Sequence, residues 1–229
     1  VYTRTREPRY LALATRIAEL TLSLQNGNLD DPNYGGIRLG PEGDPTFPGD
    51  QHIAHEANAQ SFYDIYATEV NIDAYVLLEG LFKITAERRY RQASADILNW
   101  LKRVAHNPSS HRLNRGFQDD TVAPDVHSWA ISAFGTDGLD RFEPGLSEKI
   151  IGFVEACCLS EVTYQKPDGT VLRIRGVDFI DRQRAARLGR QPLVTPEWTF
   201  QMINAYRRLE QDHLRRGNVR KAHTYRETK

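Results

Sequence analysis

Apolar residues recur at three- and four-residue spacing along most of the chain, which is the spacing of one face of an α-helix. The first such run predicts a helix from Pro8 to about Gln25, because proline suits the first position of a helix. Its larger apolar residues fall on one stripe, which we expect to be buried: Leu13, Ile17, Leu20 and Leu24.

The same periodicity predicts further helices over 68–83, 86–104, 124–135, 144–159 and 195–209, with a last segment from 218. Residues 162–165 and 171–174 alternate instead, and Pro167-Asp168-Gly169 between them is typical of a β-hairpin turn. Residues 33–39 are a candidate short strand inside a long Gly- and Pro-rich connection. Residues 181–192 are predicted to form an exposed, arginine-rich linker or a short helix.

A weak internal repeat links two of these helices. Arg9-Tyr10 precedes Ile17 by the same offset that separates Arg89-Tyr90 from Ile97, and each copy starts a helix. Helical hairpins that recur in this way indicate a solenoid or a closed α/α toroid. We therefore expect one mainly α domain over residues 1–229, built of helical hairpins that form an α/α toroid or part of one, with a small β-hairpin near 161–176.

The charge balance limits the classes of partner. Lysine plus arginine equals aspartate plus glutamate, 30 against 30, so no overall field attracts nucleic acid or an anionic membrane. No run approaches the roughly 20 apolar residues of a membrane-spanning helix, and the N-terminus lacks the apolar core of a signal peptide. We expect a soluble protein without nucleic-acid partners or membrane insertion. Its compartment and oligomeric state are left open, and the absence of an initial methionine suggests a processed chain or a fragment.

Few motifs indicate a cofactor or a metal. The glycine-rich nucleotide loops, the serine-hydrolase motif and paired Cys-x-x-Cys are absent. His52 and His55 do not follow the His-Glu-x-x-His order of zinc proteases, and we interpret them as solvated loop residues. Cys157 and Cys158 are adjacent, and neighbours in a helix do not readily reach disulfide geometry, so we expect small buried hydrophobic residues. No cofactor and no metal are predicted.

Three of the predicted helices begin with an acidic residue that an aromatic residue soon follows. If these are the inner helices of a toroid, their N-termini converge on one mouth. Carboxylates bind sugar hydroxyls and act as general acid or base, while aromatic faces stack on sugar rings. The three groups are Glu69 and Asp73 with Tyr75, Asp125 with Trp129, and Glu197 with Trp198.

The alternative for each acid is a structural role, because acids in the first turn satisfy free N–H groups and complement the helix dipole. Asp73 and His127 are the more informative residues, since each lies a few positions inside its helix. Loop residues predicted to lie at the same mouth are Arg38, Phe117 and Asp120.

At these positions the chain resembles the six-hairpin (α/α) toroid superfamily of carbohydrate-active, glycoside hydrolase-like enzymes. The resemblance is carried by residues 68–75, 88–93, 125–130 and 195–202 and extends over about 8–225. It implies acids at the inner-helix mouth and cleavage or epimerisation of saccharides. The implied catalytic positions are Glu69, Asp73, Asp125 and Glu197. About seven helices are predicted where a complete toroid has twelve, so an open arc or a fragment is also expected.

The leading hypothesis is a glycoside hydrolase that uses two of these carboxylates. Glu197 or Asp125 would donate the proton, with Asp73 or Glu69 as partner, roughly 5 to 10 Å away. The predicted saccharide-binding residues are Trp129, Trp198, Tyr75, His127, Phe117, Asp120 and Arg38.

Three alternatives stay open. One is a non-catalytic saccharide-binding or scaffolding protein in which the acids only cap. Another is a helical-repeat protein whose groove takes a peptide or a partner subunit. The third is an epimerase or lyase, which needs a base such as His127.

Overall fold

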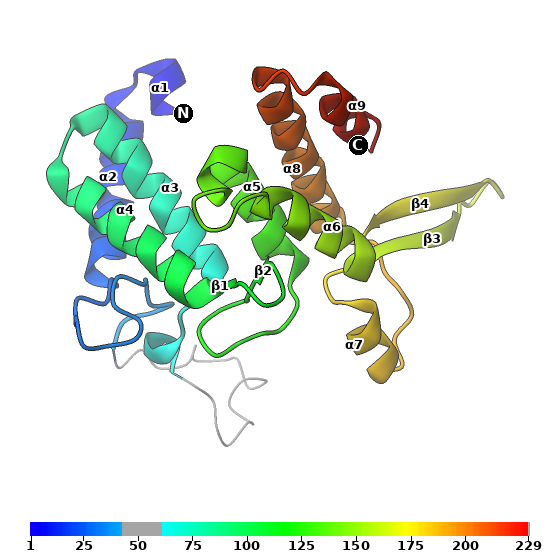
Figure 1. Cartoon of the computed structure of the whole chain (residues 1–229), viewed down its shortest axis with the longest axis horizontal. Coiled ribbons are helices and arrows are strands. Elements are labelled where there is room, and N and C mark those ends of the chain that lie inside the picture. The colour runs from blue at the N-terminus through cyan, green and yellow to red at the C-terminus, as the bar shows by residue number, and fades with distance from the viewer. Residues whose placement is uncertain (43–60, 229) are drawn as a thin grey trace. The chain divides into compact units, whose positions relative to one another are not determined.

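A computed structural model describes residues 1–42 and 61–228, and these are mostly helical (Figure 1). They divide into two compact units. The first unit is Val1–Ala105 with Gly116–Asp119, and the second is His106–Arg115 with the chain from Asp120 onward. The single domain expected over the whole chain stays a prediction.

The elements follow the sequence periodicity closely. The helices are α1 (Tyr2–Thr5), α2 (Pro8–Ser23), α3 (Thr68–Thr85), α4 (Arg88–Trp100), α5 (Pro124–Leu139), α6 (Leu146–Cys158), α7 (Arg182–Arg187), α8 (Pro196–Arg215) and α9 (Val219–Thr228). A 3₁₀ turn, η1 (Phe62–Asp64), and a π turn, η2 (Leu101–Ala105), accompany them. Two antiparallel pairs complete the described chain: β1 (His106–Asn107) with β2 (Arg112–Leu113), and β3 (Leu159–Gln165) with β4 (Val171–Val177).

In the first unit, α3 and α4 form a helical hairpin. The chain reverses at Ala86, which adopts a left-handed conformation and closes α3 with a hydrogen bond to the Phe82 carbonyl. Ile72 and Leu78 of α3 are fully buried in its core. Further along the hairpin, the Ser94 hydroxyl donates to Glu79 Oε1 at 2.9 Å.

The loop after α2 is held by buried polar side chains. Asn71 Oδ1 accepts from the Ile37 N–H at 2.7 Å, and Asn71 Nδ2 donates to the Ile37 carbonyl at 3.2 Å. Trp100 Nε1 donates to Asn33 Oδ1 at 3.1 Å. The strand expected over 33–39 was wrong, because an isolated bridge from Gln25 to Ile37 and the Asn71 amide replace a neighbouring strand.

The expected buried stripe of α2 was also wrong, because none of its four residues is buried and Leu24 is only half-buried. Leu13, Ile17 and Leu20 are 54%, 48% and 60% exposed. Within α2, Ala18 alone is buried. An amphipathic pattern shows which face a partner would cover, but nothing described in the first unit covers this one.

In the second unit, two pairs of helices repeat the hairpin arrangement. α6 runs back along α5, where the rings of His127 and Phe153 lie 5.4 Å apart. α9 runs back along α8, where Tyr225 stacks on Tyr206 at 6.2 Å. These hairpins, with the one in the first unit, confirm the expected mainly α fold with a small β-hairpin.

Helices α5 and α8 lie side by side and run in the same direction. Ser128 Oγ donates to Gln201 Oε1 at 3.5 Å near their N-terminal ends. Two turns later the Thr136 N–H donates to Asp212 Oδ2 at 2.7 Å. Both contacts join residues at nearly the same separation along the chain, so the two helices are parallel. Parallel first helices of successive hairpins are what an α/α arc requires.

A kink in α5 locks this register. Gly135 has φ 63° and ψ −172°, which breaks the helix. The Thr136 N–H released by the break is bound by the buried carboxylate of Asp212, and the Thr136 hydroxyl donates to the same oxygen at 3.1 Å. Arg208 Nη1 donates to the Ser132 carbonyl at 3.3 Å. The helices are thus joined at the point where α5 is interrupted.

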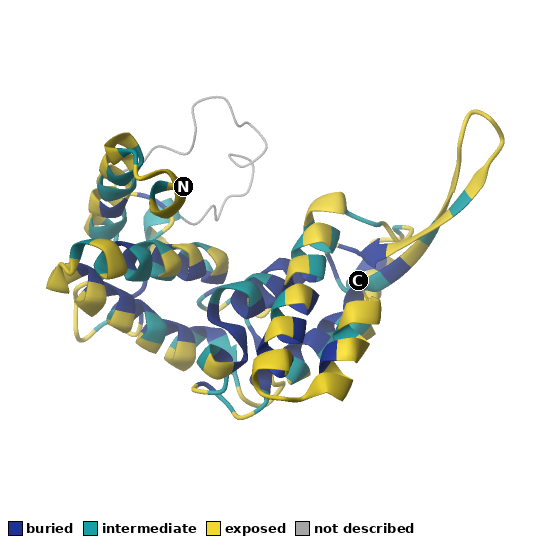
Figure 2. Ribbon diagram, turned by 90° about the horizontal axis from the view of Figure 1, so that it is seen from above, coloured by how far each residue is buried: buried dark blue, intermediate teal, exposed yellow. Residues whose placement is uncertain are grey.

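The β-hairpin leaves the body of the second unit between α6 and α8, and its outer part is exposed (Figure 2). It is longer than its alternating segments predicted. Cys157 and Cys158, at the end of α6, are joined by a disulfide, so the expectation that they stay separate was wrong. Both cysteines lie in the last turn of α6, and the chain is extended from Leu159 onward, with φ −71° and ψ 126° at that residue.

Within the described residues, no helix combines the length and hydrophobicity needed to cross a membrane.

Substitution by alanine should destabilise the protein strongly at one leucine of the first unit and hardly at all at another. Leu78→Ala should lower the free energy of unfolding by about 2–5 kcal/mol, because it empties a fully buried site. Leu20→Ala should change it by about 0.5 kcal/mol or less, because Leu20 is mostly exposed. Urea unfolding of both variants measures this, and an equal loss would mean that α2 is covered in solution.

Any side chain at Gly135 should destabilise the kink in α5. An added Cβ would lie 2.5 Å from Arg208 Nη2 and 2.6 Å from Asp212 Oδ2, at a positive φ. We expect Gly135→Ala to destabilise the protein by about 1–3 kcal/mol in thermal or urea unfolding. The control is Gly152→Ala in α6, where nothing lies within 4 Å of the added Cβ. That change should stabilise by up to about 1 kcal/mol through helix propensity.

Candidate functional site

The N-terminal ends of α5 and α8 bring two predicted acids together. Asp125 lies in the first turn of α5 and Glu197 in the first turn of α8. Because the helices are parallel and in register, the two carboxylates occupy the same end of the pair. Glu197 is exposed, and its charge is close enough to act on the ionisation of Asp125. These two acids are among the four that the sequence analysis named as catalytic positions.

Asp125 is the unusual member of the pair. It is 8% exposed, and its Oδ1 is buried without a hydrogen-bond partner in the described chain. Burial raises its pKa, and the negative charge of Glu197 adds to this effect. The backbone N–H groups at the start of α5 and the charge of Arg115 act in the opposite direction, but the pKa stays raised. A carboxyl group in this environment favours its protonated form.

The base of the β-hairpin is fixed beside Glu197. Thr195 Oγ1 donates to the Val177 carbonyl at 2.9 Å, and the Val177 N–H donates to Thr199 Oγ1 at 3.0 Å. These two threonines flank Glu197 in the sequence. The start of α8 and the end of β4 therefore move as one piece.

Aromatic and basic side chains accompany the start of α8. The half-buried Trp198 meets the edge of the Phe179 ring at 5.9 Å. The Arg190 guanidinium lies 4.6 Å from the centre of the same ring and pairs with the buried Asp178 at 2.6 Å. Trp198, as predicted, offers a partly exposed ring near Glu197, whereas sequence reasoning missed Phe179. Its position two residues before Asp-Arg-Gln-Arg (181–184) carried no signal.

His127 does not face a ligand in this structure. It is fully buried, and its Nδ1 lies 2.9 Å from the Ala123 carbonyl, so Nδ1 carries the proton. The Leu113 N–H donates to its Nε2 at 3.3 Å. Burial lowers the pKa of His127 to about 4. The neutral ring joins α5 to β2, which explains a polar side chain on an apolar helix face.

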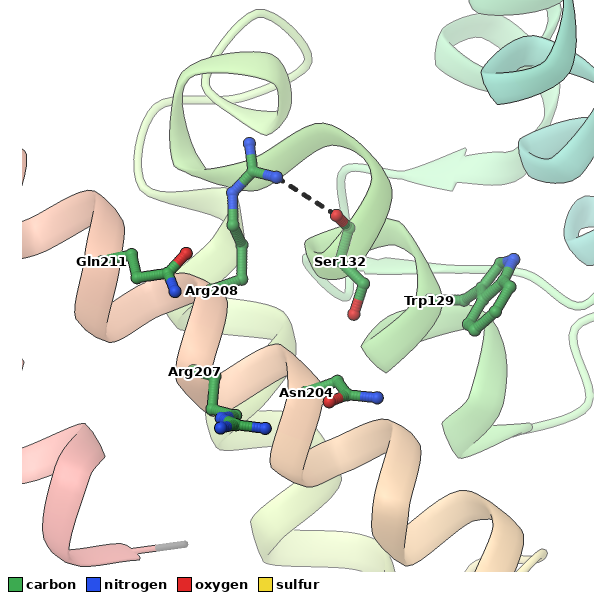
Figure 3. A pocket seen from close by; sticks show the side chains of 6 residues that line it. All are labelled: Trp129, Ser132, Asn204, Arg207, Arg208 and Gln211. Atoms are coloured by element: carbon green, nitrogen blue, oxygen red, sulfur yellow. Dashed lines mark hydrogen bonds between the residues drawn. The ribbon is translucent and has the colours of Figure 1, made fainter. Parts of the chain in front are cut away.

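The remaining predicted residue of the second unit, Asp120, is exposed, and its backbone carbonyl accepts from Arg112 Nη2 at 2.8 Å. Trp129 is half-buried and lines an open cleft between α5 and α8 (Figure 3).

The other predicted residues belong to the first unit. Glu69 and Asp73 are exposed on α3, and Tyr75 is half-buried on the same helix. Phe117 donates its N–H to the Tyr66 carbonyl at 3.0 Å.

Arg38 has the most defined environment of these residues. Its guanidinium lies 4.1 Å from the centre of the Tyr63 ring and 5.1 Å from that of Tyr66. Cation–π contacts of this kind hold the side chain in place. The structure brings the first-unit acids together on α3 and the second-unit acids at the ends of α5 and α8. That all of them share one mouth stays a prediction.

Among residues 1–42 and 61–228, no group of three or more His, Cys, Asp or Glu side chains is arranged to hold a metal ion. His52 and His55 lie outside the described residues.

Comparison with known proteins relates this fold to a glycoside hydrolase. The chain is similar to the crystal structure of a family 76 glycoside hydrolase from a bovine Bacteroides thetaiotaomicron strain, with a TM-score of 0.54 and 13% sequence identity. The match covers 96% of this chain and 42% of that one, so this chain spans less than half the length of its structural neighbour. No protein-family model and no curated protein matches the sequence. At this identity the likeness shows the fold alone.

Neutral, buried His127 should make the protein sensitive to acid. Its pKa rises from about 4 in the folded state to an ordinary 6.5 on unfolding, so the unfolded state binds more protons between these values. The free energy of unfolding should therefore fall by about 2 kcal/mol between pH 7 and pH 4.5 from this residue alone.

The measurement is the urea midpoint at the two pH values for the wild type and His127→Asn. The variant should lose less stability on acidification than the wild type does. His223→Asn, at an exposed position of α9, should behave as the wild type. Equal pH dependence in all three proteins would contradict the assignment.

Proposed function

We propose that this protein is a carbohydrate-active enzyme, a glycoside hydrolase in which Asp125 is the proton donor and Glu197 the partner carboxylate. The observation that carries the proposal is the pairing of a buried acid of raised pKa with an exposed acid at the same end of two parallel helices. A general acid and its partner carboxylate differ in their environments in this way, one buried and the other exposed to solvent. The fold similarity to a glycoside hydrolase supports the same conclusion.

Each carboxyl group has a defined task in this proposal. Protonated Asp125 gives its proton to the glycosidic oxygen as the bond from the anomeric carbon to that oxygen breaks. The ionised partner then either attacks the anomeric carbon or takes a proton from an attacking water, depending on the spacing of the two groups. In both cases the anomeric carbon ends with the hydroxyl of water, and the leaving sugar keeps the proton.

The exposed position of Glu197 suits the second task, because water and substrate reach its carboxylate. Glu69 and Asp73 are further candidates for the partner role, since they are exposed on the helix that matches α5 and α8 in the hairpin pattern. Trp198 and Trp129 would supply ring-stacking surfaces for the sugar, and Tyr75 a third.

The same residues distinguish the hydrolase from the two alternative functions, a non-catalytic saccharide-binding protein and an epimerase or lyase. A saccharide-binding protein without activity needs the aromatic residues but neither carboxyl group. An epimerase or lyase that uses His127 as its base is disfavoured, because both ring nitrogens face backbone groups and the ring is fully buried.

Substitution of the two acids tests the proposal. The full chain is incubated with a panel of yeast mannan, xylan, β-glucan and polygalacturonate, and newly formed reducing ends are counted. We expect cleavage of at least one polymer. Asp125→Asn and Glu197→Gln should each lower turnover about 10²-fold or more, because general acid–base catalysis contributes that much.

Matched controls are Asp30→Asn in the loop after α2 and Glu161→Gln on β3, which change exposed acids that are not among the predicted catalytic positions. Both should keep wild-type turnover. Glu69→Gln and Asp73→Asn complete the set and show which acid is the partner. If the wild type binds a polymer but cleaves none, or if Asp125→Asn keeps full activity, the hydrolase proposal is overturned.

A further inference from the structure

A cleft runs between α5 and α8 beyond the two acids. Its volume is about 400 Å³, and it is open to solvent. Figure 3 shows Trp129 and Ser132 on α5 and the other lining side chains along α8. The lining residues are Trp129, Ser132, Asn204, Arg207, Arg208 and Gln211.

The cleft lies on the same pair of helices as the candidate acids. Trp129 follows Asp125 by four residues, and Asn204 follows Glu197 by seven. At 1.5 Å per residue these offsets are about 6 Å and about 10 Å along the helices. An extended ligand with one end at Asp125 and Glu197 therefore reaches the cleft within the length of a few sugar units.

The charge of the cleft is positive. None of its six lining residues is acidic, and two are arginines. Arg208 Nε donates to Asp212 Oδ1 at 3.1 Å, but Arg215 pairs with the same oxygen. One buried carboxylate thus serves two guanidinium groups, which leaves positive charge at the cleft.

Arg207 adds a second positive charge. It is exposed, and no carboxylate of the described chain lies within ion-pair distance of it. Arginine favours carboxylate, sulfate and phosphate groups, because its planar fork binds two oxygens at once. A surface arginine beside a second cation, with no acid to neutralise it, is suited to an anionic group of a ligand.

The other lining groups suit a sugar. The amides of Asn204 and Gln211 donate and accept hydrogen bonds as hydroxyl groups require, and the indole of Trp129 offers a face for ring stacking. Amides, an aromatic ring and an excess of positive charge in one cleft match the groups of an acidic saccharide better than those of a neutral one.

We propose that the α5–α8 cleft binds a saccharide unit that carries a negative charge, with Arg207 as its main anion contact. This deepens the proposed function, on which it rests for the identity of the ligand as a glycan. The substrate class becomes an acidic glycan, with carboxylate or sulfate groups.

Binding to the full chain tests this inference by isothermal titration calorimetry. The probes are trigalacturonate, its trimethyl ester as the neutral counterpart, and a sulfated galactose disaccharide. We expect the wild type to bind trigalacturonate, the sulfated disaccharide or both, at least about tenfold more tightly than the ester, because hydrogen bonds to charged groups are stronger than those to neutral groups. The comparison of the two acidic probes identifies the anionic group.

Arg207→Gln should weaken binding of the preferred acidic probe about tenfold or more and leave binding of the ester unchanged. Arg220→Gln, at an exposed arginine of α9, is the matched control and should bind as the wild type. Both variants should keep the wild-type melting temperature, because neither arginine has an ion-pair partner in the described chain. Equal affinity for acidic and neutral probes, no binding of any acidic probe, or full affinity in Arg207→Gln would overturn the inference.

The outcomes for the two proposals are distinguishable. Asp125→Asn should still bind the acidic probe, because Asp125 is not part of the cleft. Acid-selective binding without cleavage of any polymer would overturn the hydrolase alone. Cleavage of a neutral polymer without acid-selective binding would overturn the cleft alone.

Discussion

The buried carboxylate of Asp212 is the contact on which the second unit depends. It accepts the Thr136 N–H and hydroxyl at the interruption of α5, and it pairs with Arg208 and Arg215 of its own helix. Burial acts to raise the pKa of Asp212, but the Thr136 N–H and the two arginines outweigh it and lower the pKa. The charge is thus kept in the interior, and a broken helix becomes the place where two helices are joined.

That junction determines what the rest of α5 and α8 can present. With the helices fixed in parallel and in register, their first turns bring Asp125 beside Glu197, and their middle turns form the cleft of Trp129 and Arg207. The acidic residues therefore lie at the N-terminal end of the helix pair, and the basic residues of the cleft lie in its middle turns. Burial is the largest influence on the ionisation of Asp125, and it outweighs the opposing charge of Arg115.

Much of the fold can be predicted from local sequence. The starts of α3, α5 and α8 agree with their Thr68, Pro124 and Thr195-Pro196 signals, and Pro167-Asp168-Gly169 indicates the hairpin. These features depend on backbone preferences of a few neighbouring residues. The exposure of Leu13, Ile17 and Leu20 was not readable, because periodicity identifies a face and not the partner that covers it.

The candidate site, too, could be predicted only in part, because the sequence does not show which residues are buried. An acid in a first turn is equally a structural and a chemical residue, and only burial separates Asp125 from an ordinary first-turn acid. His127 looked chemical because a polar group on an apolar face is unusual, but its partners are the Ala123 carbonyl and the Leu113 N–H. Backbone partners leave no side-chain pattern in a sequence. The role of Asp212 was missed for a similar reason, since it lies among many charged residues late in α8.

The contact of Thr136 with Asp212, which joins α5 to α8, has a consequence for which segments of this protein can vary in evolution. Because side chains within the two helices set their register, the connection from β3 through α7 to Thr195 carries no part of that alignment beyond its anchoring at Val177. Insertions or deletions in the outer ribbon and the α7 segment can accumulate without displacing the paired acids. Such a connection is a natural place for new ligand preferences to evolve on an unchanged frame, and for loops to be exchanged by design.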